Sequence, residues 1–355
     1  MNERLVRMNQ MMKIVKVLII GIIGAIVFDL IGIPIPWMLG PLVFNLIGQF
    51  FIKDLSMPKG LRNLGLIIVG YTIGSTFSYE LFTGSALLWG FMIGINLLLI
   101  AFCFLLSYWV HKVGNVSWMT AVSCGIPGGL SQILAFAEDD KEVNLVAVTY
   151  FQVIRILTVI IFIPFLISGH FVQGIHVEWN VHDLPLLIVL FTGCGLSVML
   201  GKKLRFPAYF IVLPILFVIF IQFTPIDVPS VPTDLNHIAQ IFLGSYIGLL
   251  LKPHMLKLSK KLLLLGLGSA IILLIVTYGT SWILREALGM SFATSYLSTA
   301  PGGLDQMGLI ASAVHAEVTV VVVFQLYRLL FIYFVIMPIL YWVKGVKERG
   351  RIIEN

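Results

Sequence analysis

Two arginines lie where a positive charge is costly. Arg155 and Arg328 each stand in the middle of a long apolar stretch, three residues after a glutamine (Gln152 and Gln325). A charge at the centre of a lipid bilayer costs at least about 2.5–3.5 kcal/mol, so such side chains usually face a cavity or a partner. The spacing of three residues places glutamine and arginine on the same face of a helix.

This polar face has two interpretations. A guanidinium group is a fork-shaped donor that can hold the anionic group of a solute. Alternatively the role is structural, and each arginine caps carbonyl groups that a nearby helix break leaves free. Both interpretations stay open at the level of the sequence.

A Pro-Gly-Gly triplet precedes each polar face, at residues 127–129 and 301–303. Proline removes a backbone donor and clashes with the preceding turn, and two glycines add backbone freedom. We therefore predict two broken segments, each either a pair of half-helices or a re-entrant hairpin. Half-helix N-termini carry partial positive charge. Paired interruptions of this kind in two halves of a membrane protein are the best sequence sign of a transport site.

The predicted solute-binding site combines the two breaks with the two polar faces. Its members are Arg155, Arg328, Gln152, Gln325, Pro127, Gly128, Gly129, Ser131, Gln132, Pro301, Gly302, Gly303, Asp305 and Gln306. Asp305 is the one acid among them, which makes it a candidate ligand for a coupling cation, Na+ or a proton. The alternatives for Asp305 are a helix N-terminal cap or an ion pair with Arg328 or Arg155.

The elements that must position these residues are long apolar segments. Hydrophobic residues make up 59% of the 355-residue chain and charged residues 11%, whereas a soluble domain has about 25% charged residues. Roughly 20 helical residues cross a bilayer. The apolar segments lie near 14–31, 35–52, 61–78, 84–110, 117–137 and 143–168, and again near 183–200, 206–223, 235–251, 261–284, 291–312 and 317–343. The chain is therefore predicted to be an all-α polytopic membrane protein.

The two halves of the chain are copies of one unit. Residues 125–138 (GIPGGLSQILAFAE) match residues 299–312 (TAPGGLDQMGLIAS) at an offset of 174. Three further pairs of matches follow the same order in both halves, among them FQVIR and FQLYR around the arginines. We therefore divide the chain into a first membrane repeat, 1–171, and a second, 172–355.

Basic residues predict how these repeats lie in the membrane. Most of the 23 lysines and arginines lie near the termini and in loops such as 53–62, 201–205 and 252–261, and basic loops stay cytoplasmic. These loops share one side only if the broken segments re-enter, which leaves five crossings per half. An odd number of crossings inverts the second repeat. The prediction is two inverted repeats, each of about five transmembrane helices plus one Pro-Gly-Gly-broken or re-entrant segment, in the cell membrane with both termini cytoplasmic.

With these motifs the chain resembles the membrane AbrB family. The resemblance is carried by the two PGGL-[SD]-Q motifs, the FQ-x-x-R pairs after them and the P-x6-P starts, over about residues 14–343. The first motif departs slightly, with Gly-Ile-Pro-Gly-Gly in place of Ala-Pro-Gly-Gly. The family is also labelled ammonia monooxygenase or AbrB-type regulator, and these labels do not define an activity. It looks similar to inverted-repeat secondary transporters of the cation/proton antiporter and bile-acid type, which is analogy at the level of the fold.

The function that we expect is secondary transport of a small anionic solute, a carboxylate for example, driven by a gradient of Na+ or H+. One alternative is a membrane-embedded regulator or sensor without flux. Another is a membrane oxygenase, although the apolar segments contain no histidine cluster. No P-loop, catalytic-triad spacing or HExxH motif occurs, so we expect no catalytic residue, cofactor or metal.

The expected partners are the solute, its coupling ion and the lipid bilayer. The chain could also form a homo-oligomer with further copies of itself. The net charge of +6 sits at segment ends, where it reports topology, so nucleic acid is not expected as a partner.

Overall fold

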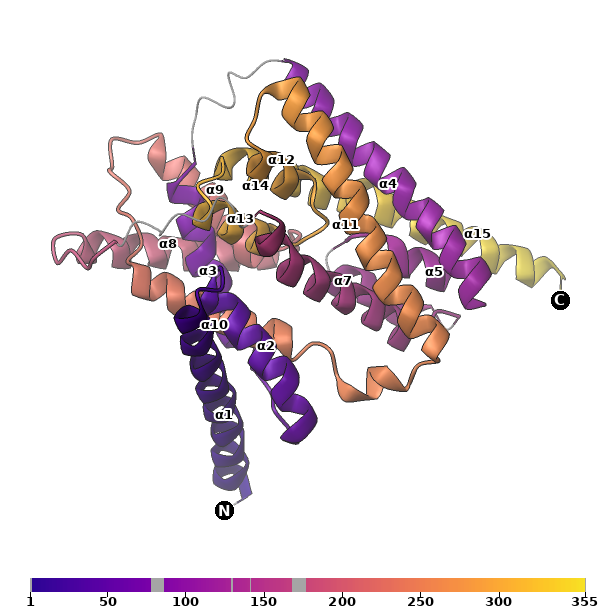
Figure 1. Ribbon diagram of the computed structural model, residues 1–355, viewed down its shortest axis with the longest axis horizontal. Helices are drawn as coiled ribbons and strands as arrows, with labels where there is room; N and C mark the ends of the chain where they lie inside the picture. Colours follow the sequence, from indigo (N-terminus) through magenta and orange to yellow (C-terminus); the bar gives the residue numbers. More distant parts are fainter. Residues whose placement is uncertain (1, 78–85, 129, 141, 168–176, 355) are drawn as a thin grey trace.

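The computed structural model describes residues 2–77, 86–128, 130–140, 142–167 and 177–354, and these are helical with no β-strand (Figure 1). The first half contains α1 (Asn2–Ile31), α2 (Pro36–Phe51), α3 (Lys59–Ser75), α4 (Ala86–Gly114), α5 (Trp118–Gly125), α6 (Leu130–Asp139) and α7 (Leu145–Leu166). The second contains α8 (Leu184–Lys203), α9 (Tyr209–Gln222), α10 (Thr233–Gly248), η3 (Pro253–Lys257), α11 (Lys260–Leu288), α12 (Phe292–Thr299), α13 (Leu304–Ala313), α14 (Val318–Phe331), η4 (Ile332–Ile336) and α15 (Met337–Glu354). Every predicted apolar segment contains a helix, which confirms the all-α prediction.

Six spans are long and apolar enough to cross a membrane. They are Gln10–Ile31, Ala86–Gly114, Leu145–Leu166, Leu184–Lys203, Lys260–Leu288 and Val318–Val346. The helices α2, α3, α9 and α10 have 16, 17, 14 and 16 residues, fewer than the roughly 20 that span the hydrocarbon core. Crossing by these shorter helices stays a prediction.

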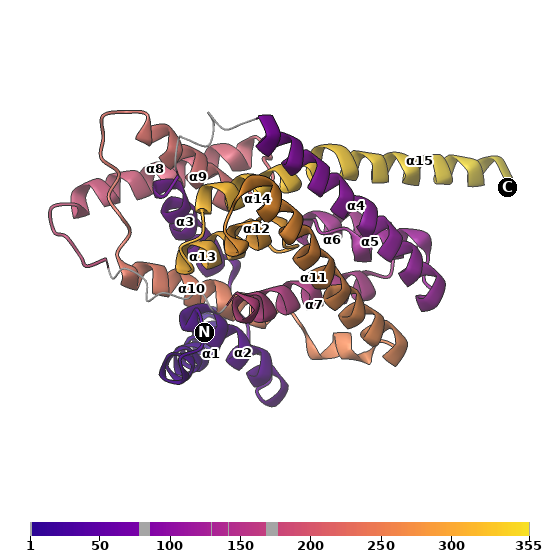
Figure 2. The same cartoon turned by 45° about the horizontal axis from the view of Figure 1, so that its top comes forward.

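The helices pack as two bundles, and each bundle draws on both halves of the sequence. The scaffold bundle consists of α1, α2, α3, α8, α9 and α10. The break bundle consists of α4 to α7 and α11 to α15, with η4 inside its last long helix. The most extensive contacts between the two bundles are those of α3 with α13 and α14. Figures 1 and 2 show the scaffold bundle around the N-terminus and the break bundle toward the C-terminus.

Glycines set the closest contacts inside the scaffold bundle. A Cβ atom at Gly70 or Gly74 of α3 would lie against backbone carbonyl oxygens of α9. At Gly244 or Gly248 of α10 it would lie against carbonyl oxygens of α2. These glycines occupy equivalent positions in the two halves. Each half therefore packs its glycine-bearing helix against the proline-containing helix of the other half, through small residues that let backbones approach.

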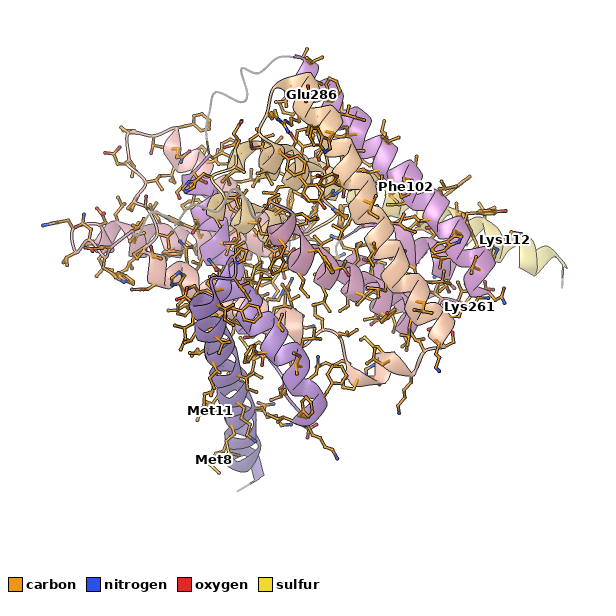
Figure 3. The ribbon with its side chains drawn as sticks, in the orientation of Figure 1. Met8, Met11, Phe102, Lys112, Lys261 and Glu286 are labelled. Atoms are coloured by element: carbon orange, nitrogen blue, oxygen red, sulfur yellow. The ribbon has the colours of Figure 1, made fainter. Side chains whose placement is uncertain are left out.

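The equivalent long helices α4 and α11 pack against each other in opposite directions. Figure 3 places Lys112, near the end of α4, toward the same end of the pair as Lys261, near the start of α11, and Glu286 at the far end. Phe102 lies part-way along α4, between these two ends of the helix pair. An inverted repeat requires opposite directions for this pair, and inversion of the two halves as a whole remains a prediction.

Candidate functional site

Both Pro-Gly-Gly triplets interrupt a helix, as predicted. The first break separates α5 from α6 and the second separates α12 from α13. Ile126 and Ala300, which precede the prolines, have extended backbones (ψ 125° and 138°). A residue before proline is pushed out of the helical region, so the proline itself stops each half-helix.

The two half-helices that lead into the breaks begin with the same cap. The Ser117 hydroxyl accepts from the backbone N–H of Thr120 at 3.2 Å, and the Thr120 hydroxyl accepts from the N–H of Asn144 at 3.0 Å. In α12 the hydroxyl groups of Ser291 and Thr294 make the equivalent contacts, at 3.1 Å each. The start of each half-helix is thus fixed to the start of the arginine-bearing helix that follows.

At the first break, Gln152 and Arg155 bind freed backbone carbonyls. Gln152 Nε2 donates to the carbonyl oxygens of Ser123 at 2.8 Å and Ile126 at 3.0 Å. Arg155 Nη1 donates to the same Ile126 carbonyl at 3.3 Å, and Nη2 donates to Gln152 Oε1 at 2.6 Å. Arg155 is 6% exposed, and its Nε has no hydrogen-bond partner in the described part of the chain.

The second break repeats this arrangement with more contacts. Gln325 Nε2 donates to the carbonyl oxygens of Leu297 at 2.7 Å and Ala300 at 3.1 Å, and Arg328 Nη2 donates to Gln325 Oε1. Arg328 also donates to the carbonyl oxygens of Thr299 at 3.1 Å, Ala300 at 2.8 Å and Gly302 at 3.3 Å. The structure therefore confirms the carbonyl-capping interpretation of both arginines, and direct contact with a solute stays a prediction.

The two guanidinium groups lie close enough to interact through charge. The ion pairs in the described ranges join Lys13 to Asp54 and Lys344 to Asp139. Neither Arg155 nor Arg328 has a carboxylate partner there. Two buried like charges thus share one region, where their repulsion in a low-dielectric setting favours a negative group between or beside them.

Asp305 lies in the first turn of α13, whose N-cap is Gly303. Its carboxylate Oδ2 accepts from Gln306 Nε2 at 2.7 Å. Within the described ranges it forms no ion pair with Arg328 or Arg155, so that alternative from the sequence is wrong. Its place in the first turn still suits a negative charge at a helix N-terminus.

The remaining predicted residues surround the first break. Gly128 lies next to Ile332 of η4, which brings the second half of the chain against the first break. The side-chain Oε1 of Gln132 has no hydrogen-bond partner among the described residues. Gly129 and the side chain of Ser131 lie outside the described part of the chain.

Two features of the site were missed at the level of the sequence. The carbonyl groups of Ile126 and Ala300 are the shared acceptors of both polar side chains at each break, and their position before proline was a usable signal. The π-turn η4, four residues after Arg328, had no signal in an even apolar run. Such π-turns are frequent at functional sites.

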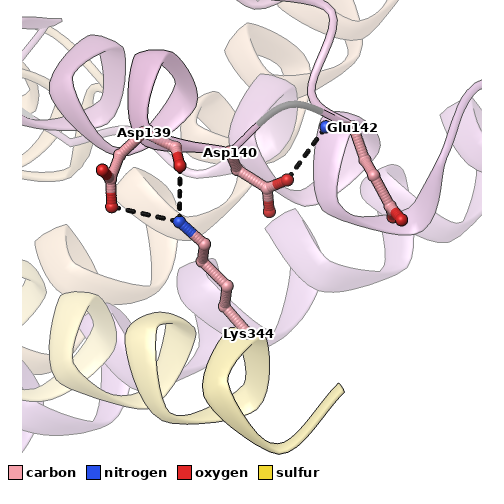
Figure 4. A network of polar contacts seen from close by, with 4 residues as sticks. All are labelled: Asp139, Asp140, Glu142 and Lys344. Carbon is pink, nitrogen blue, oxygen red and sulfur yellow. Dashed lines mark hydrogen bonds and ion pairs between the residues drawn. The ribbon is translucent and has the colours of Figure 1, made fainter. Parts of the chain in front are cut away.

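The far end of α6 is tied to the C-terminal helix. Lys344 Nζ donates to the Asp139 carbonyl oxygen at 2.6 Å and pairs with its carboxylate at 3.0 Å (Figure 4). Asp140 Oδ1 accepts from the N–H of Glu142 in the turn that follows. The Phe136 and Tyr341 rings pack edge to face between the same two helices, with centroids 5.0 Å apart. The half-helix after the first break is therefore held by α15 of the second half.

Comparison with known proteins finds one family across this architecture. The family model described as "Transition state regulatory protein AbrB" matches residues 37–344. "Uncharacterized protein YhjN" of Bacillus subtilis (strain 168) is 24% identical over 343 residues, covering 89% of each chain. "Putative regulator AbrB" of Escherichia coli (strain K12) is 24% identical over 318 residues, covering 88% of this chain and 90% of its own. Both breaks and both arginines fall inside the matched residues.

Proposed function

The chain belongs to the membrane AbrB family, and from this premise and the paired breaks we propose that it is a secondary transporter of a small anionic solute. The solute binds in the membrane between the two Pro-Gly-Gly breaks, and an ion gradient drives its movement. The protein is then not an enzyme, and its site uses no cofactor.

One observation carries this proposal: two buried arginines without a carboxylate partner in the described ranges. Both guanidinium groups are buried, and the positive charge of Arg155 acts on Arg328. A carboxylate or similar anion bound beside them would offset the repulsion between them. The N-termini of α6 and α13 begin at the same breaks and add partial positive charge.

The arrangement of the bundles supplies a means of movement. The site lies entirely in the break bundle, whose strongest contacts with the scaffold bundle run through α3. A small interface lets one bundle rock against the other around a fixed site. We place both termini on the cytoplasmic side of the cell membrane.

The test is solute flux in liposomes that contain the purified protein. Small carboxylates and sulfonates are supplied outside under an imposed H+ or Na+ gradient, and their uptake is measured. Wild-type protein should accumulate at least one of them, whereas Arg155→Gln and Arg328→Gln should lose uptake. Arg285→Gln is the matched control, because Arg285 stacks on Trp282 near the end of α11, away from the breaks.

Equal uptake by both site variants and the wild type would reject the binding role of the arginines. No accumulation of any anion by the wild type, under either gradient, would reject anion transport.

A second candidate function follows from the names of the family and one relative. Both speak of regulation, and a membrane-embedded sensor could use the same anion site without flux. Deletion of the encoding gene separates the two. If the protein is a sensor, deletion should change transcript levels, and the Arg328→Gln protein should fail to restore them. Flux assays of the wild-type protein should then give no solute transport that explains the change.

A further inference from the structure

Two acceptor oxygens converge beside Gly303. Gln306 Nε2 donates to Asp305 Oδ2 at 2.7 Å, and the carboxylate also accepts from the backbone N–H groups of Asp305 and Gln306. The two oxygens that converge are Asp305 Oδ1 and Gln306 Oε1. A Cβ atom at Gly303 would contact both of these oxygens, so they point to the same place. Gln306 is 7% exposed, and its Oε1 has no hydrogen-bond partner in the described part of the chain. A carboxylate oxygen repels the partial negative charge of an amide oxygen at close range, and a proton between the two turns this repulsion into a hydrogen bond.

We propose that such a proton is bound here: Asp305 is a protonation site, and Gln306 is the partner that holds its protonated form. In that form Asp305 Oδ1–H donates to Gln306 Oε1, while Gln306 Nε2–H still donates to Asp305 Oδ2. Carboxyl and amide then make two parallel hydrogen bonds, and the buried Gln306 Oε1 gains the partner that it lacks. The proton is taken from water on one side of the membrane and released to water on the other, with no other bond made or broken.

A metal ion fits this place less well than a proton. Hard cations take a shell of several oxygen ligands. At this break the carbonyl oxygens of Thr299, Ala300 and Gly302 already accept from Arg328, and that of Gly303 accepts from the N–H of Met307. A single proton needs only one carboxyl oxygen and one amide oxygen, which Asp305 and Gln306 supply.

Three helices pack against α13, and two of them, α3 and α14, bring charged groups toward Asp305. From α3, Arg62 acts on Asp305 through charge. From α14, Arg328 donates to the carbonyl oxygen of Gly302, which lies three residues before Asp305 in the sequence. The other titratable side chains on these helices and on α12 are Lys59, Tyr71, Tyr296 and Tyr327. The ionised carboxylate therefore partly offsets the positive charge of Arg62, and protonation removes that offset.

This charge change links the proton to the solute, an inference that rests on the proposed function. With Asp305 ionised, its negative charge opposes an anion at the neighbouring arginines. With Asp305 protonated, the site is more positive and the anion binds more tightly. Because such linkage is reciprocal, the bound anion also favours protonation of Asp305. The two are carried together.

The first half offers a natural comparison. Ser131 stands at the position equivalent to Asp305, and Gln132 stands at the position equivalent to Gln306. Gln132 Oε1 also lacks a partner among the described residues, yet no carboxyl group neighbours it in sequence. The protonation site is therefore at the second break, and the first break has no equivalent of it.

The first test detects the proton without any solute. Infrared difference spectra between acid and alkaline buffer are recorded for the full-length protein in lipid nanodiscs, where a protonated carboxyl gives a band of its own. The wild type should show a band that Asp305→Asn lacks. Gln306→Leu, which keeps the carboxyl and removes its acceptor, should shift that band. Asp29→Asn, an exposed aspartate at the end of α1, should leave it unchanged.

The second test measures anion affinity as a function of pH. Methanesulfonate is the probe, because its own charge does not change with pH. Its binding to the wild type should weaken by about 5- to 150-fold from acid to alkaline buffer, the usual range of such coupling. Asp305→Asn, which resembles the neutral form, should bind it with the same affinity throughout.

The outcomes separate this inference from the proposed function. Three results would overturn the proton site. They are an infrared band that persists in Asp305→Asn, a methanesulfonate affinity that depends on pH in that variant as in the wild type, and loss of the band when Na+ is added at constant pH. Failure of methanesulfonate to bind at any pH, with the Asp305 band present, supports the proton site and counts against anion transport.

Discussion

At the scale of single residues, the two breaks share a pattern of hydrogen bonds and differ in charge. Each glutamine bridges two carbonyl oxygens and orients an arginine three residues later. The second break adds contacts from Arg328 and a carboxylate, Asp305. The two breaks thus share one arrangement of backbone contacts, while the chemistry of their side chains differs.

The larger number of acceptors at Arg328 predicts an unequal cost of removal. Hydrogen bonds to charged groups contribute about 1.5–3 kcal/mol each, and a buried acceptor without a donor is destabilising. Arg328→Ala should therefore lower the stability of the protein by more than Arg155→Ala, by at least about 1.5 kcal/mol. Thermal unfolding of both variants in the same detergent measures the difference. Equal losses would contradict the role of the extra contacts.

Gly303 gives a second prediction at this scale. A methyl group there would push against Asp305 Oδ1 and Gln306 Oε1, so Gly303→Ala should disturb the carboxyl–amide pair and reduce transport. Overpacking of this kind costs about 1–3 kcal/mol. Gly90→Ala is the control, because nothing lies within 4 Å of the new methyl on α4. Transport and thermal unfolding are compared for the two variants, and identical behaviour would argue against a crowded Gly303.

At the scale of elements, sequence reasoning found the helices and their interruptions. Long apolar runs and proline before two glycines are local signals, so the breaks at 127–129 and 301–303 could be placed to the residue. The sequence did not show which acceptors Arg155 and Arg328 bind, because the choice of acceptor depends on how each half-helix folds back. The pairing of α3 with α9 and α10 with α2 depends on contacts distant in sequence, which no local pattern reports.

The glycine contacts between these helices predict a stability difference. A methyl group at Gly244 would meet the Met38 carbonyl oxygen in α2, which cannot move aside easily. Gly244→Ala should therefore destabilise the protein by about 1–3 kcal/mol. At Gly268 of α11 the nearest atom, from Trp109, lies 3.9 Å away, so Gly268→Ala should be neutral or stabilising by about 0.4–1 kcal/mol. Thermal unfolding of the two variants decides, and a neutral Gly244→Ala would refute the close contact.

At the scale of the whole molecule, the division into bundles cuts across the division into repeats. The break bundle holds the candidate site, and α3 is the main helix that touches it from the scaffold bundle. The side chain of Ile73 in α3 lies against Gly308 in α13. Relative motion of the bundles must change this contact.

Cross-linking at this contact tests the proposed motion. Ile73→Cys with Gly308→Cys, joined by a short thiol-reactive cross-linker, should stop transport, and uptake should return with a cleavable reagent after reduction. The control places the cysteine pair at Ile20 and Gly48, between α1 and α2 inside the scaffold bundle, where a methyl group added at Gly48 would lie 3.7 Å from the Ile20 side chain. Full uptake by the cross-linked Ile73–Gly308 protein would show that this interface does not move.

The predicted inversion is tested from outside the cell. In a background without Cys103, Cys124 and Cys194, a membrane-impermeant maleimide should label Arg285→Cys in intact cells. It should label Lys203→Cys only after the membrane is opened, since loop 201–205 is predicted to be cytoplasmic. Labelling of Lys203→Cys in intact cells would place the second half the other way up.

The pairing of α3 with α9 and α10 with α2 also constrains how the protein is made. When the ribosome has finished the first half, the glycine face of α3 and the carbonyl-lined face of α2 still lack their partners. Those partners, α9 and α10, lie more than a hundred residues further along the chain than α3 and α2. Neither half can close a bundle alone, so an early product waits in the membrane with unfilled surfaces. Two separately encoded halves should accordingly be degraded when made singly and survive when made together.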